Sequence, residues 1–127
     1  MSNAERKYDL EERTAKFGEA VIEFAKKVPK NEITSSIINQ LVRSATSVGV
    51  NYCEADCAET RKDFEHKLGI CKKEAKETKH WLRMISKAVP DIKLEAVKLW
   101  KESNELLLIF IAIVKKSRAN GIVKLEN

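Results

Sequence analysis

The strongest constraint on the fold of this chain is the apolar periodicity between Thr60 and Val89. In that stretch, small or apolar side chains recur at alternating spacings of four and three residues, which places them on one side of an α-helix. They are Phe64, Leu68, Cys71, Ala75, Thr78, Leu82, Ile85 and Val89. Such a seam is typical of a helix that packs lengthwise against other helices. We therefore expect the chain to fold around one helix of about 28 residues, roughly 40 Å long.

Basic side chains form a second stripe beside the seam. Its members, again spaced by threes and fours, are Lys72, Lys76, Lys79, Arg83 and Lys87. Residues 61–87 hold nine basic and four acidic side chains, a net of +5, whereas the rest of the chain holds fifteen of each sign. We predict that this stripe binds nucleic acid, because a positive strip on a neutral body attracts polyanions. The pattern fits equally well a solvated surface with intrahelical pairs, such as Glu77 with Lys73.

Three more helices are predicted around this one. The four expected ranges are residues 10–28, 34–58, 61–88 and 92–119. Val28-Pro29 and Val89-Pro90 end the first and third helices, because the residue before a proline disfavours the helical backbone. Long helices with short connections and no strand pattern predict an all-α, antiparallel up-down-up-down four-helix bundle, which forms a single domain over residues 1–127.

Capping residues predict where these helices begin and end. Side-chain oxygens that can accept a hydrogen bond from the first helical turn are placed at Asp9, Thr34, Thr60 and Asp91. Ile33 and Ile38 are spaced for a hydrophobic staple at the second helix. Asn120-Gly121 is expected to stop the fourth helix.

The second helix carries a regular polar stripe beside its apolar one. The polar residues are Ser36, Gln40, Arg43, Ser47, Asn51 and Glu54. This stripe is either an ordinary solvent-exposed face or a hydrogen-bonded seam against a neighbouring subunit.

The fourth helix is apolar on more than one side. The inward face is expected to consist of Val97, Leu99, Trp100, Leu106, Leu107, Phe110, Ile113 and Val114. Leu108, Ile109 and Ala112 are expected to point outward, bordered by charged residues. An apolar patch with a charged rim usually marks an interface, so we predict an oligomer interface at these three residues.

The sequence offers little support for an enzyme. A ferritin-like di-iron site needs Glu-x-x-His on two helices, whereas Asp63-Phe-Glu-His66 and Glu77-Thr-Lys-His80 lie on one predicted helix, about 21 Å apart. Cys53 and Cys57 are four residues apart, but no second pair completes a metal site. Trp81 lies off the seam and either packs or stacks on a base. We expect no catalytic residue, no metal and no cofactor.

The apolar segments are too short for a membrane protein. The longest apolar run, Leu106 to Val114, has nine residues, and the first residues lack the apolar core of a signal peptide. Three cysteines, an odd number, do not suggest a disulfide framework. We expect a cytoplasmic protein without a membrane partner.

Several short motifs resemble a known family. They are Gln40-Leu-Val-Arg43-Ser-Ala-Thr-Ser47-Val-Gly-Val-Asn51-Tyr-Cys-Glu54, Asp63-Phe64, Lys67-Leu68, Lys73-Glu74-Ala75, Glu77-Thr78 and Trp81-Leu82. The stretch from Leu10 to Val114 resembles the small four-helix-bundle proteins encoded in intervening sequences of bacterial 23S ribosomal RNA genes. The accessory variability proteins of diversity-generating retroelements look related. Members often carry Gly after the motif's final Glu, where this chain has Ala55, so the second helix is expected to end later.

The resemblance implies a ring of identical subunits, five being the expected number, with a role at RNA or in a nucleoprotein complex. We therefore expect a non-enzymatic homo-oligomer that binds RNA or another nucleic acid through the stripe from Lys72 to Lys87. The alternative is a protein–protein adaptor ring that docks an acidic partner of a nucleoprotein complex.

Overall fold

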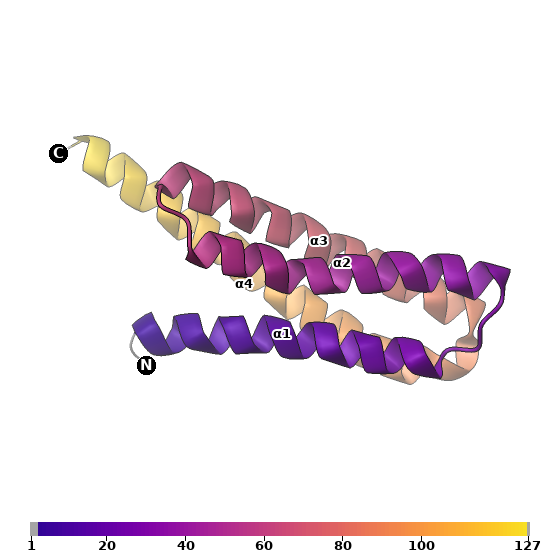
Figure 1. The fold of residues 1–127 in the computed structure, drawn as a ribbon. Coiled ribbons are helices and arrows are strands. Elements are labelled where there is room, and N and C mark those ends of the chain that lie inside the picture. The colour runs from indigo at the N-terminus through magenta and orange to yellow at the C-terminus, as the bar shows by residue number, and fades with distance from the viewer. Residues whose placement is uncertain (1–2, 127) are drawn as a thin grey trace.

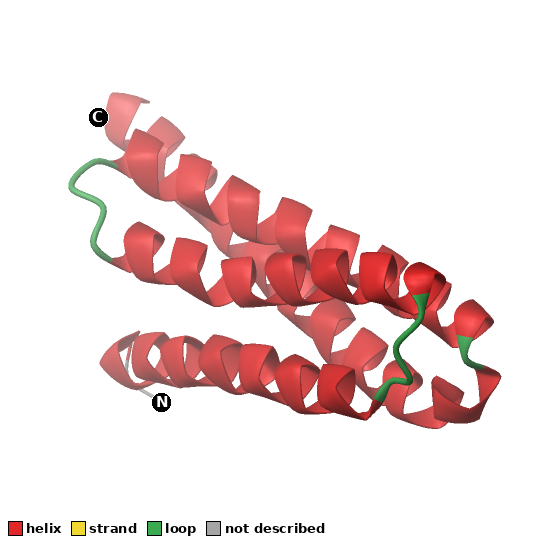
Figure 2. Ribbon diagram, turned by 45° about the vertical axis from the view of Figure 1, so that its right-hand side comes forward, coloured by secondary structure: helices red, strands yellow, loops and turns green. Residues whose placement is uncertain are grey.

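Helices make up almost all of the described chain. The computed structural model describes the backbone of residues 3–126 and the side chains of residues 10–121. The elements are α1 (Asn3–Lys27), α2 (Glu32–Asp56), α3 (Arg61–Ala88), the short 3-10 turn η1 (Pro90–Ile92) and α4 (Lys93–Glu126). Residues 3–126 contain no strand (Figure 2). The predicted all-α class with four long helices is confirmed.

The helices pack side by side in the order of the chain. α2 contacts α1 and α3, α3 contacts α4, and α4 returns to α1. The α1–α2 and α3–α4 connections lie at one end of the molecule, whereas the α2–α3 connection lies at the other end, with both termini (Figure 1). The four helices therefore surround one shared core.

The α2 helix begins with a capping box centred on Asn31. Asn31 Oδ1 accepts hydrogen bonds from the backbone N–H groups of Ile33 and Thr34, at 2.9 and 3.0 Å. The Asn31 N–H in turn donates to Thr34 Oγ1 at 2.9 Å. The predicted cap at Thr34 is wrong, because Thr34 is the partner three residues inside the helix. The predicted staple is not observed either, since Ile33 is 67% exposed.

The other helix boundaries agree with the sequence in part. Thr60 caps α3 as predicted, since its Oγ1 accepts the Asp63 N–H at 3.1 Å. The predicted start at Asp9 is wrong because the backbone is helical from Asn3 onward. Asp91 lies inside η1, where no side chain caps, so α4 begins two residues later. The stop at Asn120-Gly121 is wrong, because α4 continues to Glu126 with no glycine of the described chain in the left-handed conformation that such a stop uses.

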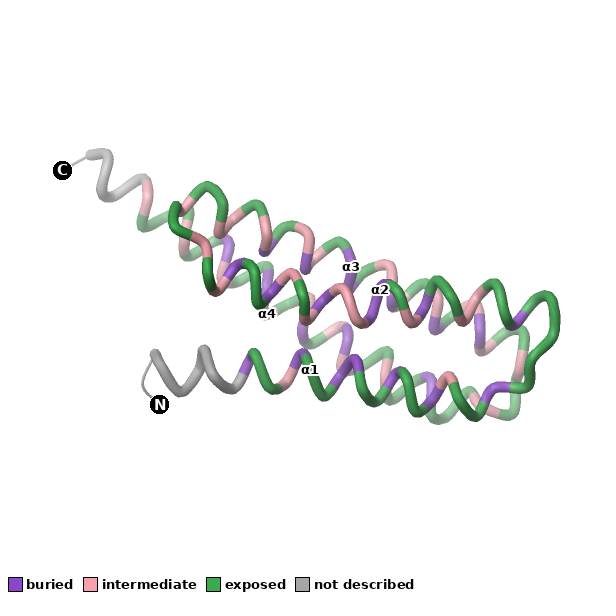
Figure 3. Tube along the Cα trace, viewed as in Figure 1, coloured by how far each residue is buried: buried purple, intermediate pink, exposed green. Residues whose placement is uncertain are grey.

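The core contains buried residues from all four helices (Figure 3), among them most of the predicted seam of the third helix. On α3, six of the eight seam residues are at most 1% exposed: Leu68, Cys71, Ala75, Thr78, Leu82 and Ile85. Phe64 and Val89, at its ends, are only half-buried and pack against the core. The α2 helix ends at Asp56, two residues before the predicted end at residue 58. Ala55, the residue on which that prediction rested, is buried.

The inward face of α4 differs from the prediction. Val97 and Trp100 are each 37% exposed, whereas Ala96 and Ser103 are buried. The Ser103 hydroxyl donates to the backbone carbonyl of Ala75 on α3 at 2.8 Å, which satisfies it inside the core. The buried face of α4 was mispredicted because it includes a small residue, Ala96, and a polar residue, Ser103, which an apolar pattern does not reveal. No helix of the described chain has the length and apolarity needed to cross a bilayer.

Candidate nucleic-acid interface

The acidic side chains in the middle of α3 turn toward α2. Arg43 of α2 donates from Nη2 to Glu77 Oε2 at 2.8 Å and from Nη1 to Glu74 Oε2 at 3.4 Å. Glu74 is only 7% exposed, so this contact neutralises a nearly buried charge. The hydrogen bond to Glu77, the largest cause, raises the pKa of Arg43. Both carboxylates thus bind Arg43 instead of the intrahelical lysine expected for a merely solvated surface.

The polar stripe of α2 contributes to the seam between α2 and α3 of the same chain. Besides Arg43, Glu54 binds Lys67 Nζ at 2.8 Å. Behind these ion pairs, the buried Thr78 hydroxyl donates to Ser44 Oγ at 2.9 Å. Most of the stripe is exposed, as one of the two alternatives predicted, and two of its residues also pair with α3. These α2–α3 contacts fix the rotation of α3 about its axis, and that rotation determines where the basic stripe faces.

The basic stripe lies on the opposite side of α3, along its border with α4. Lys76, Arg83 and Lys87 are exposed and Lys72 is half-buried. None of the four takes part in an ion pair within the described residues. Lys79 differs, because its Nζ donates to Asn104 Oδ1 at 2.8 Å and lies 4.5 Å from the centroid of the Trp100 ring. The stripe therefore has four uncompensated charges and one that is engaged with α4.

The α4 helix adds a second wall that the sequence analysis missed. Next to Arg83, a shallow groove of about 310 Å³ runs between α3 and α4. Its lining includes Lys93, Val97, Trp100 and Lys101 but no carboxylate. The signal was present in the sequence, since Lys93, Val97, Trp100 and Asn104 are spaced by four, three and four. Assigning Trp100 to the core concealed this stripe.

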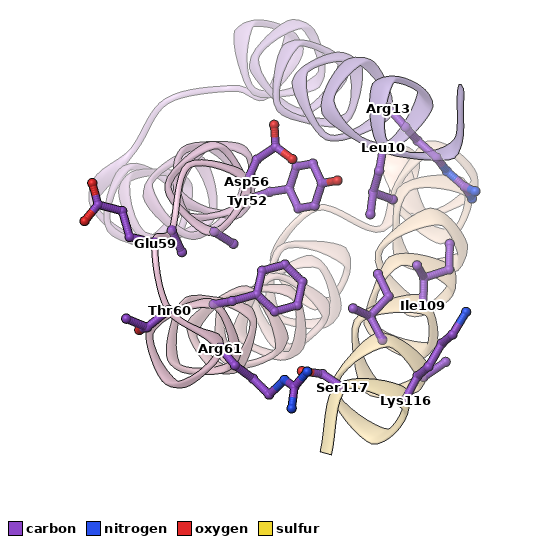
Figure 4. Close-up of a pocket in the computed structure, with 15 residues that line it drawn as sticks. Leu10, Arg13, Tyr52, Asp56, Glu59, Thr60, Arg61, Ile109, Lys116 and Ser117 are labelled. Atoms are coloured by element: carbon purple, nitrogen blue, oxygen red, sulfur yellow. The ribbon is translucent and has the colours of Figure 1, made fainter. Parts of the chain in front are cut away.

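A larger cavity lies at the other end of the bundle. It measures about 830 Å³ and has apolar walls from all four helices, with charged residues at its edge (Figure 4). Leu10, Tyr52 and Phe64 belong to these walls. Burial raises the pKa of Tyr52 to about 12. The cavity lies where α1, near Leu10, faces α4, near Ile109.

The predicted interface residues on α4 separate in the structure. Leu108 is 57% exposed, and Ala112 is also exposed. Ile109 is only partly exposed, packs against the core and lines the large cavity together with Ala112. The prediction that Ile109 points outward is wrong, because its side chain packs against the core and lies on the cavity wall. Leu108 and Ala112 remain as the surface part of the predicted interface.

A family model described as the 23S rRNA-intervening sequence protein matches residues 6–109. The chain belongs to this family. A solved structure of a protein of unknown function from the S23 ribosomal protein family of Bacteroides thetaiotaomicron is similar, with 28% identity and a TM-score of 0.78. The match covers 86% of this chain and 97% of that one. No curated protein matches the sequence.

The cysteines and Trp81 are the other candidate site residues of this member of the 23S rRNA-intervening sequence protein family. Cys53 and Cys57 are exposed free thiols, and Cys71 is buried with its pKa raised to about 12, mainly by burial. Within the described side chains, no three His, Cys, Asp or Glu residues are close enough to hold a metal ion. Trp81 is half-buried, packs against the core and meets His80 edge-on at 5.1 Å between ring centroids.

Proposed function

We propose that this chain is a non-enzymatic, cytoplasmic homo-oligomer that binds RNA, or another nucleic acid, through the basic face of α3. The observation that carries the proposal is the separation of charge on that helix. Its central carboxylates, Glu74 and Glu77, are bound by Arg43 on the α2 side. Lys72, Lys76, Arg83 and Lys87 have no carboxylate partner within the described chain. A strip of uncompensated cations attracts the phosphate backbone without reading its sequence.

The assembly proposed for this surface is a ring of identical subunits, five by the family resemblance. An antiparallel up-down-up-down arrangement belongs to the same proposal, supported by helix connections that lie at alternating ends of the molecule (Figure 1). Repetition of one basic strip around a ring raises the overall affinity for a long polyanion through multivalency. The exposed Leu108 and Ala112 on α4 support a contact between subunits, because such apolar surface is favourable to bury.

The salt dependence of RNA binding tests the proposal. With about five phosphate contacts per subunit to a single strand, the logarithm of the association constant should fall with the logarithm of salt concentration at a slope near −3 to −4. Charge reversal in the double variant Lys76→Glu, Arg83→Glu should lower the affinity at least tenfold and make the slope shallower. Filter binding or fluorescence anisotropy with a labelled RNA measures both quantities.

A matched variant separates the strip from net charge. Lys16→Glu with Lys30→Glu changes the net charge equally but alters exposed lysines of α1 and the α1–α2 connection, away from the α3–α4 face. Its RNA affinity should stay within about threefold of the parent, because exposed charges beyond a Debye length are screened. Equal losses in both double variants would reject a localised site. If RNA binding persists and a co-purified acidic protein is lost instead, the adaptor function replaces this one.

A further inference from the structure

The groove between α3 and α4 carries an exposed aromatic ring among cations. Trp100 is 37% exposed and lines the groove with Arg83, Lys93 and Lys101. Tryptophan is on average highly buried, and leaving part of an indole in water forgoes a large apolar contribution to stability. The exposed part of this indole is therefore available to contact another molecule.

The structure holds the Trp100 ring in a defined position. Lys79 Nζ lies 4.5 Å from the centroid of its ring, and the same ammonium group donates to Asn104 Oδ1 at 2.8 Å. A cation–π contact and a fixed lysine restrict the rotamers of the indole before any ligand arrives. A rigid aromatic surface costs little conformational entropy when a flat group stacks on it.

The charges of the groove select a polyanion with flat groups. The groove is lined by three cations and by no carboxylate, and its volume of about 310 Å³ lies at the lower end of the range for small-molecule sites. Phosphates can form ion pairs with the three cations, and an unstacked base can stack on the indole. A duplex keeps its bases stacked inside, so the combination fits a single strand.

We propose that Trp100 is a stacking platform for one base of single-stranded RNA or DNA, whose flanking phosphates bind Arg83, Lys93 and Lys101. This inference rests on the proposed function and deepens it, because it assigns the unpaired strand as the ligand and extends the site from α3 onto α4. It also moves the base-stacking role considered for Trp81 to the other tryptophan, since Trp81 packs against the core.

The test compares a base-bearing strand with an abasic strand of equal charge. The probes are a fluorescein-labelled oligouridylate of about 12 nucleotides and an abasic oligomer of the same length. The parent should bind the oligouridylate more tightly than the abasic oligomer. Trp100→Ala should weaken oligouridylate binding about 5- to 150-fold and leave the abasic oligomer unaffected. Trp100→Phe should restore part of the preference, and the salt slope should not change in either variant.

Trp81→Phe provides the matched control and a direct signal. This variant should keep the parent's affinity, and its only tryptophan, Trp100, should show fluorescence quenching when the oligouridylate binds. Equal affinities for the two oligomers in the parent, or an unchanged affinity in Trp100→Ala, would overturn the stacking role while the electrostatic function stands. Absence of salt-dependent binding to either oligomer would remove both. Equally tight binding of polyglutamate would show recognition by charge alone and overturn the inference.

Discussion

At the scale of single residues, two arginines tie helices together through carboxylates. Arg43 joins α2 to α3, and Arg13 joins α1 to α4 by donating to Glu102 at 2.8 and 2.7 Å and to Glu105 at 2.8 Å. A bidentate guanidinium–carboxylate contact has a fixed geometry that a single lysine cannot give. These contacts determine which charges remain available at the surface.

The Arg13–Glu102 contact predicts a pH-dependent contribution to stability. Hydrogen bonds from Arg13 lower the pKa of Glu102 below its usual value. A carboxyl group with a lowered folded-state pKa stabilises the fold above its unfolded pKa, and this contribution is lost as the pH falls through the folded value. Glu102→Gln should therefore reduce the free energy of unfolding by about 0.5–1 kcal/mol at neutral pH, since the side chain is partly exposed. Urea unfolding near pH 7 and pH 3 measures the difference.

Glu95→Gln serves as the control for that measurement. The Glu95 carboxylate lies 3.8 Å from Lys27, and both side chains are more than half exposed. Its loss should change stability by no more than a few tenths of a kcal/mol at either pH. A Glu102→Gln effect that is the same at both pH values would contradict the role assigned to the ionised carboxylate.

At the scale of elements, the start of α2 could not be placed from the sequence, because two neighbouring residues could each form its cap. Both Asn31 and Thr34 are residue types that cap helices, and they stand three residues apart. Asn31 forms the cap because its extended backbone lets Oδ1 reach two N–H groups. Thr34 is buried and donates to the carbonyl of Pro29 at 2.6 Å, which joins the α1–α2 connection to the helix.

Asn31→Ala should reduce the free energy of unfolding by about 1–2 kcal/mol, because two backbone N–H groups lose their acceptor. Asn31→Asp keeps an acceptor at the same place and should stay within about 0.5 kcal/mol of the parent. Chemical denaturation at one protein concentration compares the three proteins. Equal stability of the alanine variant and the parent would show that the capping box is not a stabilising element here.

At the scale of the whole molecule, the outer face of α4 carries the proposed contact between subunits. Leu108→Glu should give a species of lower mass than the parent in multi-angle light scattering, because a charge replaces an exposed leucine at the proposed contact. Loss of assembly should also weaken RNA binding, since the strips no longer act together.

Val50→Glu on α2 is the matched substitution. Val50 is 58% exposed and Leu108 is 57% exposed, so each change puts a carboxylate in place of an equally accessible apolar side chain. The mass of this variant should equal that of the parent. A smaller mass for Val50→Glu alone would place the subunit contact on the α1–α2 side and reject the α4 interface.

The fold was largely predictable because helix periodicity is a local property. The seam from Leu68 to Ile85 follows from side-chain spacing alone, and so does the cap at Thr60. Spacing failed on α4, where Trp100 was assigned to the core. Residue type was misleading there. A tryptophan is usually a core residue, and only its neighbours in space show otherwise. A serine is usually a surface residue, and only the acceptor of its hydroxyl shows that Ser103 can be buried.

The sequence by itself determined the four helices, the apolar seam of α3 and the existence of a basic stripe, since each depends on residues a few positions apart. Only the tertiary structure decided which charges beside that stripe are paired and which are not. It paired Glu74 and Glu77 with an arginine more than thirty positions away, engaged Lys79 with Trp100, and set Ile109 on a cavity wall. The physical reason is that charge compensation and burial depend on neighbours in space, which packing of one helix against another brings together.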